Sequence, residues 1–456
     1  MNCKSTAFPL PPKADLRINK LNKDLYFTFT HMLWGIIICL GFLALIYTAF
    51  LKLPFFKTSK LSTSILCVAF LLKLAGAIAL FLIYSYYYQD RASADIFKYY
   101  DDAVLIFEDE NWQISKLGDL FQKENDRSTE TISILQDTQH WDQQWHILPN
   151  DNRLMILVNL FLLYISQGFY LFHLLFFAFL SFIGSIALFH FFSSLINLGS
   201  RLLLAILILP PSSLLWTSGM LKESIFLFAF GLLLFTIYKL KNSMDRWLIP
   251  LFLLMLGLSI WVKSYLLICF TPALLLYLSK DSLKLRFNLL LTFFSLLIAM
   301  LILWPSFEAS LNEQLQRFTE LALEIEANTY FPIDSIDGFG GFIMGVPEAI
   351  YNVWIRPIMM WDAGLFSLIN AIESTIYLVL PFILIPFARS NGNKRLLITM
   401  LISFILLASI IIGSSIPVMG AVLRYRSPLL PFYILLLFTF VDTNKLKHQL
   451  FRHEVN

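Results

Sequence analysis

The chain has 456 residues, of which 58% are hydrophobic and only 14% charged, and its mean hydropathy is +0.70. This composition excludes an ordinary soluble domain, which is about a quarter charged, and a net charge of +3 is too small to indicate a nucleic-acid partner. The four cysteines lie in the N-terminal tail or in apolar runs, so they predict neither a disulfide framework nor a CxxC metal site. We therefore expect an all-α integral membrane protein.

Apolar runs long enough to cross a bilayer recur along most of the chain. A spanning helix needs about 20 apolar residues, and fewer where flanking Lys and Arg reach the interface. The sequence predicts ten or eleven spans within a membrane domain of residues 26–441, between a basic tail at 1–25 and a cytoplasmic tail at 442–456. The expected spans are 26–50, 61–88, 170–198, 202–219, 222–238, 247–262, 264–280, 287–306, 374–388, 396–416 and 427–441.

Charge placement predicts the orientation of these spans. Two large acidic loops are expected, 89–153 with 14 acidic and 6 basic residues and 307–373 with 10 acidic and 2 basic residues. The short loops at 52–60 and 239–246 are basic instead. Because Lys and Arg accumulate on the cytoplasmic side, we expect the acidic loops outside. The same parity places the N-terminus outside although its tail holds five basic and two acidic residues, and this conflict stays open.

Two ambiguous runs are assigned by this parity. A single helix over residues 247–279 would be about 50 Å long, which is too long for one crossing. Because both of its ends are basic, we predict a hairpin with Lys263 at the outer turn. The uncharged run 154–200 is predicted to hold one span after a surface or re-entrant helix near 154–167, because two spans would invert every later loop.

Carboxylates follow the second predicted span directly. The stretch 94–103 contains Asp95, Asp101 and Asp102. A carboxylate at the membrane surface can act as a general base, which takes the proton of a sugar hydroxyl as that hydroxyl attacks. The alternative interpretation is the start of an ordinary solvated acidic loop.

Basic residues reach the same predicted face from later spans. Lys222 follows a break containing Pro and Ser, Lys263 lies at the expected hairpin turn, and Arg424 and Arg426 precede the last span. Ionisable groups at membrane depth are costly and indicate function, and arginine binds phosphate through two parallel hydrogen bonds. The alternative is that these side chains are interfacial anchors. The histidines do not cluster, so neither a cofactor nor a dedicated metal site is expected, and a divalent cation stays an open alternative.

Three of these stretches together resemble polytopic, lipid-sugar-dependent glycosyltransferases of the GT-C type, such as those of bacterial cell envelopes. They are the Asp-bearing stretch from Asp95 to Ala103, the Pro-Ser break from Pro211 to Glu223 and the Arg-Tyr-Arg-Ser-Pro element from Arg424 to Pro428. The resemblance implies a catalytic Asp early in the first outer loop, which maps to Asp95, with Asp101 or Asp102 as the alternatives. It also implies basic residues that bind the donor phosphate, and the candidates are Lys222, Arg424 and Arg426, with Lys263.

The implied activity is transfer of a hexosyl or pentosyl unit from a polyprenyl-phosphate donor to an envelope glycan or lipid acceptor. The reaction would take place on the outer face of a bacterial inner membrane, with the lipid-linked donor, the acceptor and membrane lipids as partners. Two alternatives stay open: a polymerase of lipid-linked repeat units, and a transporter or flippase of an anionic lipid-linked solute. A transporter is expected to show internal repeats with broken helices near the midplane, and the sequence contains no convincing repeat.

Overall fold

The computed structural model describes most of the chain, and the described part is almost entirely helical and contains no β-strand. This confirms the all-α prediction. The predicted basic tail at 1–25 and most of the predicted tail at 442–456 lie outside the described residues. The described residues are 29–57, 60–88, 91, 94–110, 112–122, 126–141, 151–243, 245–278, 304–388, 394–443 and 445–446.

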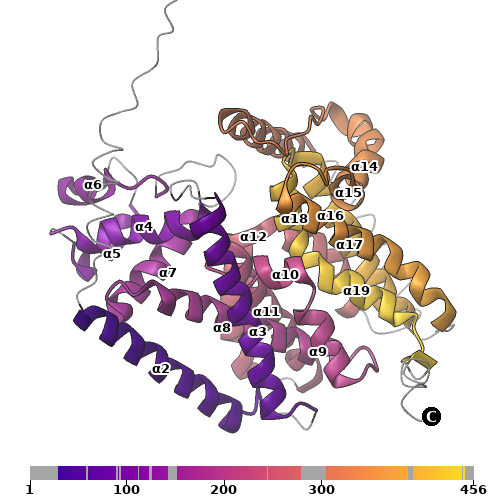
Figure 1. The fold of residues 1–456 in the computed structure, drawn as a ribbon, viewed down its shortest axis with the longest axis horizontal. Coiled ribbons are helices and arrows are strands. Elements are labelled where there is room, and N and C mark those ends of the chain that lie inside the picture. The colour runs from indigo at the N-terminus through magenta and orange to yellow at the C-terminus, as the bar shows by residue number, and fades with distance from the viewer. Residues whose placement is uncertain are drawn as a thin grey trace, which may run out of the picture.

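The helices follow one another in the order shown in Figure 1. Those of the first half are α2 (Phe29–Lys52), α3 (Thr63–Leu82) with a π-helical extension (Ile83–Tyr88), α4 (Asp95–Glu108), α5 (Leu117–Leu120), α6 (Thr129–Leu135), α7 (Asp151–Ser166), α8 (Tyr170–Ser193), α9 (Ser200–Ile208) and α10 (Pro211–Trp216). Those of the second half are α11 (Lys222–Ser243), α12 (Ile249–Leu278), α14 (Gly338–Trp354), α15 (Arg356–Met359), α16 (Leu365–Leu384), α17 (Arg395–Ser415), α18 (Met419–Arg426) and α19 (Leu430–Thr439).

Eight helices among the described residues are long and apolar enough to cross a membrane, so the chain is a multi-pass membrane protein. They are α2, α3 with its extension, α8, α11, α12, α16, α17 and the continuous α18–α19 pair. Three differences separate this number from the ten or eleven predicted spans. The two predicted spans 247–262 and 264–280 are the two limbs of α12, which is counted once. The span predicted at 202–219 is broken, and most of the span predicted at 287–306 lies outside the described residues.

The span predicted at 202–219 is wrong as a single helix, because the chain forms the short helices α9 and α10 instead. Pro210 and Pro211 separate them, and a proline in a helix interior removes a backbone donor and clashes with the preceding turn. The end of α10 is tied to α3 by Lys73, whose Nζ donates to Thr217 Oγ1 at 2.8 Å. The buried lysine in the second predicted span therefore has a polar partner on the broken helix.

The hairpin predicted at Lys263 is confirmed by the contacts of α12. The helix has non-helical backbone angles at Lys263 (φ −150°, ψ 67°). Lys263 contacts Glu223 at the start of α11, whereas the Tyr277 carbonyl accepts a hydrogen bond from Lys241 near the end of α11. Because α12 also begins just after α11 ends, its first limb runs to the start of α11 and its second limb returns.

Close backbone packing joins α8 to α11 in the middle of the bundle. A Cβ atom added at Gly184 would collide with the backbone carbonyl of Leu227, and one added at Gly231 would collide with the carbonyl of Gly184. Small residues allow such an approach between helices in a membrane, where packing rather than the hydrophobic effect holds them together. This contact fixes α11, whose first turn carries Lys222 and Glu223.

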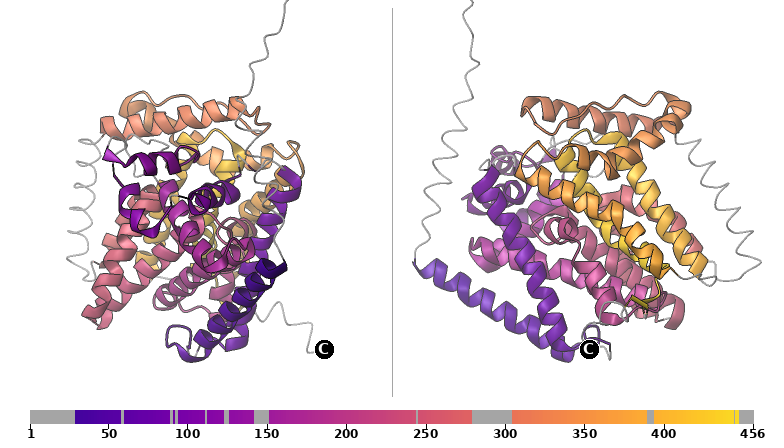
Figure 2. Two further views of the ribbon diagram at one scale, coloured as in Figure 1. Left: turned by 90° about the vertical axis from the view of Figure 1, so that its left-hand side faces the viewer. Right: turned by 45° about the vertical axis from the view of Figure 1, so that its right-hand side comes forward.

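Both acidic segments lie at one end of the molecule. α4, α5 and α6 of the first segment and the helices between residues 304 and 359 of the second lie in the upper half of Figure 1, with α5 the lowest of them. The end of α2 and the start of α3 lie at the opposite end (Figure 1 and Figure 2). This shared position agrees with the expectation that both acidic segments lie on one face. Both segments contain helices, although they were expected to be loops.

The predicted orientation of the spans can be tested with reporter fusions. A reporter that is active only in the cytoplasm should be active when fused after Met244 or Asn393 and silent when fused at Ser128 or Ser335. The physical reason is that the basic short loops stay inside while the acidic segments are exported. Activity at Ser128 or Ser335 would contradict the orientation, and equal expression of all four fusions, checked by immunoblot, is the control.

Candidate functional site

Charged side chains from four helices meet at the start of α11. Glu223 of α11 accepts hydrogen bonds from Lys263 at the α12 turn and from Arg424 of α18. Arg424 also contacts Asp95, the first residue of α4, and Asp95 contacts Lys98 one turn later. We call these five residues the charged cluster. It joins segments that lie far apart in the sequence.

Arg424 lies at the centre of the charged cluster and uses two edges of its guanidinium group. Its Nε lies 2.9 Å from Glu223 Oε1 and its Nη2 lies 3.1 Å from Oε2, so this edge forms a two-bond fork. Its Nη1 donates to Asp95 Oδ2 on the other side. Lys263 Nζ donates to the same Glu223 Oε1 at 2.9 Å. The two carboxylates therefore fix the orientation of the guanidinium plane.

The charged cluster has a closed side and a more open side. The Glu223 side chain is fully buried and that of Lys263 is 5% exposed. The side chains of Arg424, Asp95 and Lys98 are 14%, 17% and 18% exposed. A molecule that approaches the cluster therefore meets Asp95 and Lys98 before it meets Glu223.

The environment of Asp95 keeps its carboxyl group ionised. Burial acts to raise the pKa of Asp95, but Arg424 and Lys98 outweigh burial through charge and hydrogen bonds and hold the pKa well below its ordinary value. Asp95 also lies in the first turn of α4, where the helix dipole favours negative charge. While it is paired in this way, Asp95 is a weak base.

A second ion pair flanks the charged cluster. Lys222 Nζ lies 2.6 Å from Asp151 Oδ1 and 2.7 Å from Asn152 Oδ1, at the start of α7. Its ammonium group also lies 5.3 Å from the centre of the Tyr99 ring. Aromatic rings continue along the cluster, with Trp216 5.9 Å from the Arg424 guanidinium. The flanking pair adds a cation and a carboxylate, so the combined region holds four cations and three carboxylates.

Asp101 and Asp102 have partners outside the charged cluster. Asp101 receives two hydrogen bonds from Arg91, Nε to Oδ2 at 2.9 Å and Nη2 to Oδ1 at 2.6 Å. Burial raises the pKa of Asp101 although Arg91 acts to lower it. Asp102 accepts the backbone N–H groups of Gln139 and His140 at 3.1 and 2.8 Å. These contacts hold the first acidic segment together, and they favour a structural role for both residues.

Arg426 belongs to a different polar group from Arg424. It is fully buried, and its Nη1 and Nη2 donate to the Val353 carbonyl and to Ser374 Oγ, each at 3.0 Å. One residue from Ser374, Glu373 accepts hydrogen bonds from the backbone N–H of Ser212 on α10 at 3.0 Å and from the Tyr377 hydroxyl at 2.6 Å. α16 begins at Leu365 rather than at the predicted residue 374, and this buried network supplies the partners of Glu373, which lies inside the helix.

Because Arg426 is buried and hydrogen-bonded, we expect it to contribute to the stability of the fold. Arg426→Ala should lower the free energy of unfolding by about 3 kcal/mol or more, because it removes two charge-assisted hydrogen bonds from a buried site. Thermal unfolding in detergent measures this loss. The folded fraction should keep its affinity for a lipid phosphate. Unchanged stability combined with lost binding would instead support the donor-binding role expected from the sequence.

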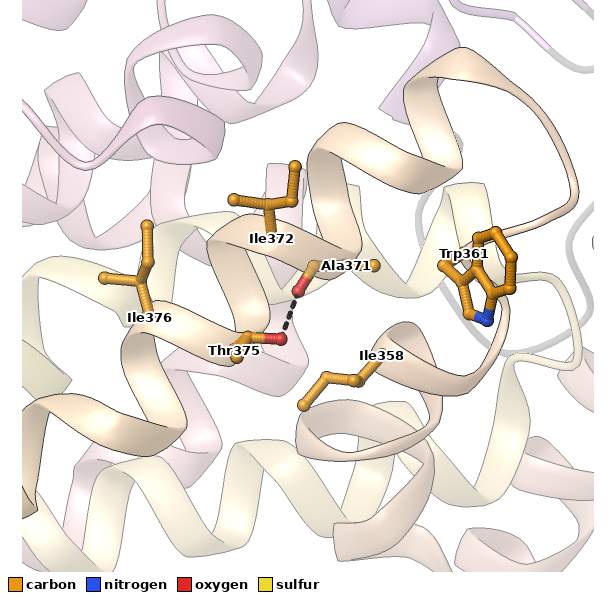
Figure 3. Close-up of a pocket in the computed structure, with 6 residues that line it drawn as sticks. All are labelled: Ile358, Trp361, Ala371, Ile372, Thr375 and Ile376. Carbon is orange, nitrogen blue, oxygen red and sulfur yellow. Dashed lines mark hydrogen bonds between the residues drawn. The ribbon is translucent and has the colours of Figure 1, made fainter.

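Two grooves on the surface are separate from the charged cluster. One, of about 340 Å³, lies between α15 and α16, and Figure 3 shows that its lining is apolar apart from Thr375, whose hydroxyl donates to the Ala371 carbonyl. The other, of about 290 Å³, lies between α3 and α9. Neither lining contains a residue of the charged cluster. The candidate site residues therefore line neither groove.

The carboxylates of the charged cluster are all in contact with cations. Within the described part of the chain, no group of three or more His, Cys, Asp or Glu side chains is placed to hold a metal. Each carboxylate of the cluster is instead paired with Arg or Lys. Such pairs compete with a metal for the carboxylate oxygens, and they supply the cations that a phosphate needs.

The seven predicted site residues divide into three groups. Asp95, Lys263 and Arg424 meet in the charged cluster, and Lys222 flanks it. Asp101, Asp102 and Arg426 bind other partners. Sequence reasoning missed Lys98, Asp151 and the central role of Glu223. The signal for Glu223 was present, since it is an acid beside Lys222 at the start of an apolar helix, whereas nothing in the sequence pairs Asp151 with Lys222.

Comparison of the chain with protein-family models, with curated proteins and with solved structures finds no match.

Proposed function

We propose that this protein is a membrane glycosyltransferase that passes a sugar from a polyprenyl-phosphate donor to an envelope glycan or lipid acceptor on the outer face. The observation that carries the proposal is the contact between Asp95 and Arg424 inside the charged cluster. It brings a carboxylate that can take a proton next to a guanidinium group that can bind phosphate. The resemblance of the Asp95, Lys222 and Arg424 stretches to GT-C enzymes supports the same reading.

The proposed reaction has one bond formed and one broken at the sugar. The acceptor hydroxyl oxygen attacks C1 of the donor sugar, and Asp95 takes the hydroxyl proton. The bond between C1 and the phosphate oxygen breaks, and its electron pair leaves with the polyprenyl phosphate. Arg424 and Lys98 stabilise the negative charge that develops on this leaving group, as preorganised donors do in other transfer reactions.

The composition of the region suits an anionic lipid. The region holds four cations and three carboxylates, so one positive charge is in excess, and Lys98 is the most exposed of the four cations. A hydrocarbon chain attached to the phosphate can stay in the bilayer while its headgroup reaches the end of α18. Substrates that remain in the membrane do not require an aqueous tunnel to the site.

Release of polyprenyl phosphate tests the proposed function. The full chain in nanodiscs should convert polyprenyl-phosphate sugars to polyprenyl phosphate when an acceptor is present, with the product followed by thin-layer chromatography. A panel of hexosyl and pentosyl donors covers the unspecified sugar. Turnover of at least one donor that disappears in Asp95→Asn supports the proposal, and no turnover across the panel counts against it.

One observation favours a transporter as the second candidate. Two interrupted helices meet the charged cluster, the α9–α10 pair through the segment before Lys222 and α12 through its turn at Lys263. Carriers place broken helices at their binding sites. Movement of a lipid-linked solute between the leaflets of liposomes, with no release of polyprenyl phosphate, would select this candidate over the enzyme.

A further inference from the structure

We infer that Arg424 and Lys98 form a phosphate-binding site that the Asp95 side chain occupies in the resting protein, and that an incoming lipid phosphate takes the place of Asp95. The inference rests on the proposed function only in naming a lipid phosphate as the anion. It goes further by assigning Asp95 a second role, as the internal ligand that closes the site. Binding of the substrate would then release the carboxylate that is needed as the base.

The contacts of Arg424 indicate that an anion can be exchanged at the Nη1 side of its guanidinium group and not at the Nε–Nη2 edge. The edge with Nε and Nη2 is held in a fork by Glu223, which is fully buried and bound to Lys263 as well. Among the residues that the structure describes, the Nη1 side has a single carboxylate partner, Asp95. If a phosphate took the place of Asp95 on Arg424, the fork to Glu223 would stay intact and the guanidinium would stay in position. If a phosphate displaced Glu223 instead, the Glu223 carboxylate would be left buried with no access to water.

The exposure of the side chains also indicates that Asp95, and not Glu223, is the carboxylate that an incoming phosphate displaces. Asp95 and Lys98 are the more open members of the charged cluster, and Glu223 and Lys263 are the closed members. Both partners of Asp95, Arg424 and Lys98, are cations. A phosphate that binds them keeps both charges balanced, so the exchange substitutes one anion for another and does not strand a buried cation.

Freed from Arg424, Asp95 would become a stronger base. The nearby positive charges hold its pKa well below the ordinary value in the closed arrangement. A phosphate on Arg424 and Lys98 neutralises these charges, and a negative charge nearby disfavours a second ionised group. The proton acceptor would thus become effective only when the donor is bound.

The direct test measures the affinity of Asp95→Asn for polyprenyl phosphate in nanodiscs of neutral phosphatidylcholine. Exchange predicts that the variant binds the lipid about tenfold or more tightly than the parent, because the neutral amide no longer competes with the phosphate for a charge-assisted hydrogen bond. The matched control is Asp101→Asn on the same helix, which removes an equal charge but leaves Arg424 paired, and its affinity should match that of the parent. Equal or weaker binding by Asp95→Asn would overturn the inference.

Two further ligands identify the source of the phosphate. Polyprenol, which lacks phosphate, should show no gain in Asp95→Asn, and a gain would overturn the inference because it would not depend on the anion. Inorganic phosphate tests the headgroup alone. A gain seen with polyprenyl phosphate and also with inorganic phosphate supports exchange with any phosphate, and a gain restricted to the lipid supports exchange that needs the chain.

A measurement on the parent protein keeps the inference testable if the variant does not fold. A hydrophobic carbodiimide modifies carboxyl groups that are free of an ion pair, and mass spectrometry locates the product. Polyprenyl phosphate should increase the modification of Asp95, and polyprenol should not. Unchanged or reduced modification on lipid binding would overturn the exchange. The proposed transfer activity would survive that result, because it is measured separately by product release.

Discussion

Arg424→Ala should lose most of its affinity for a polyprenyl-phosphate ligand and should also be the least stable of the single variants of the charged cluster. The substitution removes the guanidinium that holds both Asp95 and Glu223. Removing one partner of a buried ion pair costs about 3–5 kcal/mol, because the remaining charge stays buried without compensation. Thermal unfolding and lipid binding, both measured in the same nanodiscs, report the two losses.

A conservative variant and a surface variant serve as controls. Arg424→Lys should recover part of the stability but less of the binding, because lysine keeps the charge and loses the two-bond fork to Glu223. Arg317→Ala removes an ion pair with Glu313 that is about one-third exposed on both sides, and it should cost less than about 1 kcal/mol. If Arg424→Ala were as mild as Arg317→Ala, the charged cluster would be an ordinary surface network.

Asp95→Asn should reduce sugar transfer by roughly 10²–10⁴-fold, the usual contribution of a general base. Asparagine keeps the size of the side chain but cannot accept the hydroxyl proton. The loss should appear in turnover and not as weaker donor binding, since the phosphate contacts of Arg424 and Lys98 remain. Initial rates measured at saturating donor separate these two effects.

Asp101→Asn and Asp102→Asn are the matched comparisons for this loss. Both lie on α4 with Asp95, but their carboxylates bind Arg91 and the backbone at Gln139 and His140. They should keep transfer near the parental rate once corrected for the amount of folded protein. If one of them lost activity and Asp95→Asn did not, the base would be a different carboxylate of the same helix.

Most spans could be predicted from the sequence because a spanning helix requires a continuous apolar run, which is a local pattern. Apolar runs and basic flanks located the spans from α2 to α8, and the charged residues at both ends of 247–279 were sufficient to predict the reversal at Lys263. Pro210 and Pro211 were recognised as a break, but one span was still predicted over 202–219. Two short helices replace a span there because the polar groups freed by the prolines are satisfied by partners on other helices, such as Glu373, which no local pattern identifies.

The candidate site was predictable by residue type but not by pairing. Arg424 and Arg426 look equivalent in the sequence, since both are basic and two positions apart. In α18 they project differently, because two residues correspond to about 200° of helix rotation. One therefore reaches Asp95 and Glu223 and the other reaches Ser374. Such choices depend on how distant helices pack, and this information is not carried by spacing along the chain.

Electron cryo-microscopy of the full chain in nanodiscs with polyprenyl phosphate would locate the bound phosphate. The charged cluster is proposed as a lipid-phosphate site that Asp95 closes at rest. We predict phosphate density in contact with Arg424 and Lys98, with the Asp95 carboxylate displaced from Arg424 and Glu223 still in its fork. Phosphate density elsewhere, with Asp95 still paired to Arg424, would contradict the claim.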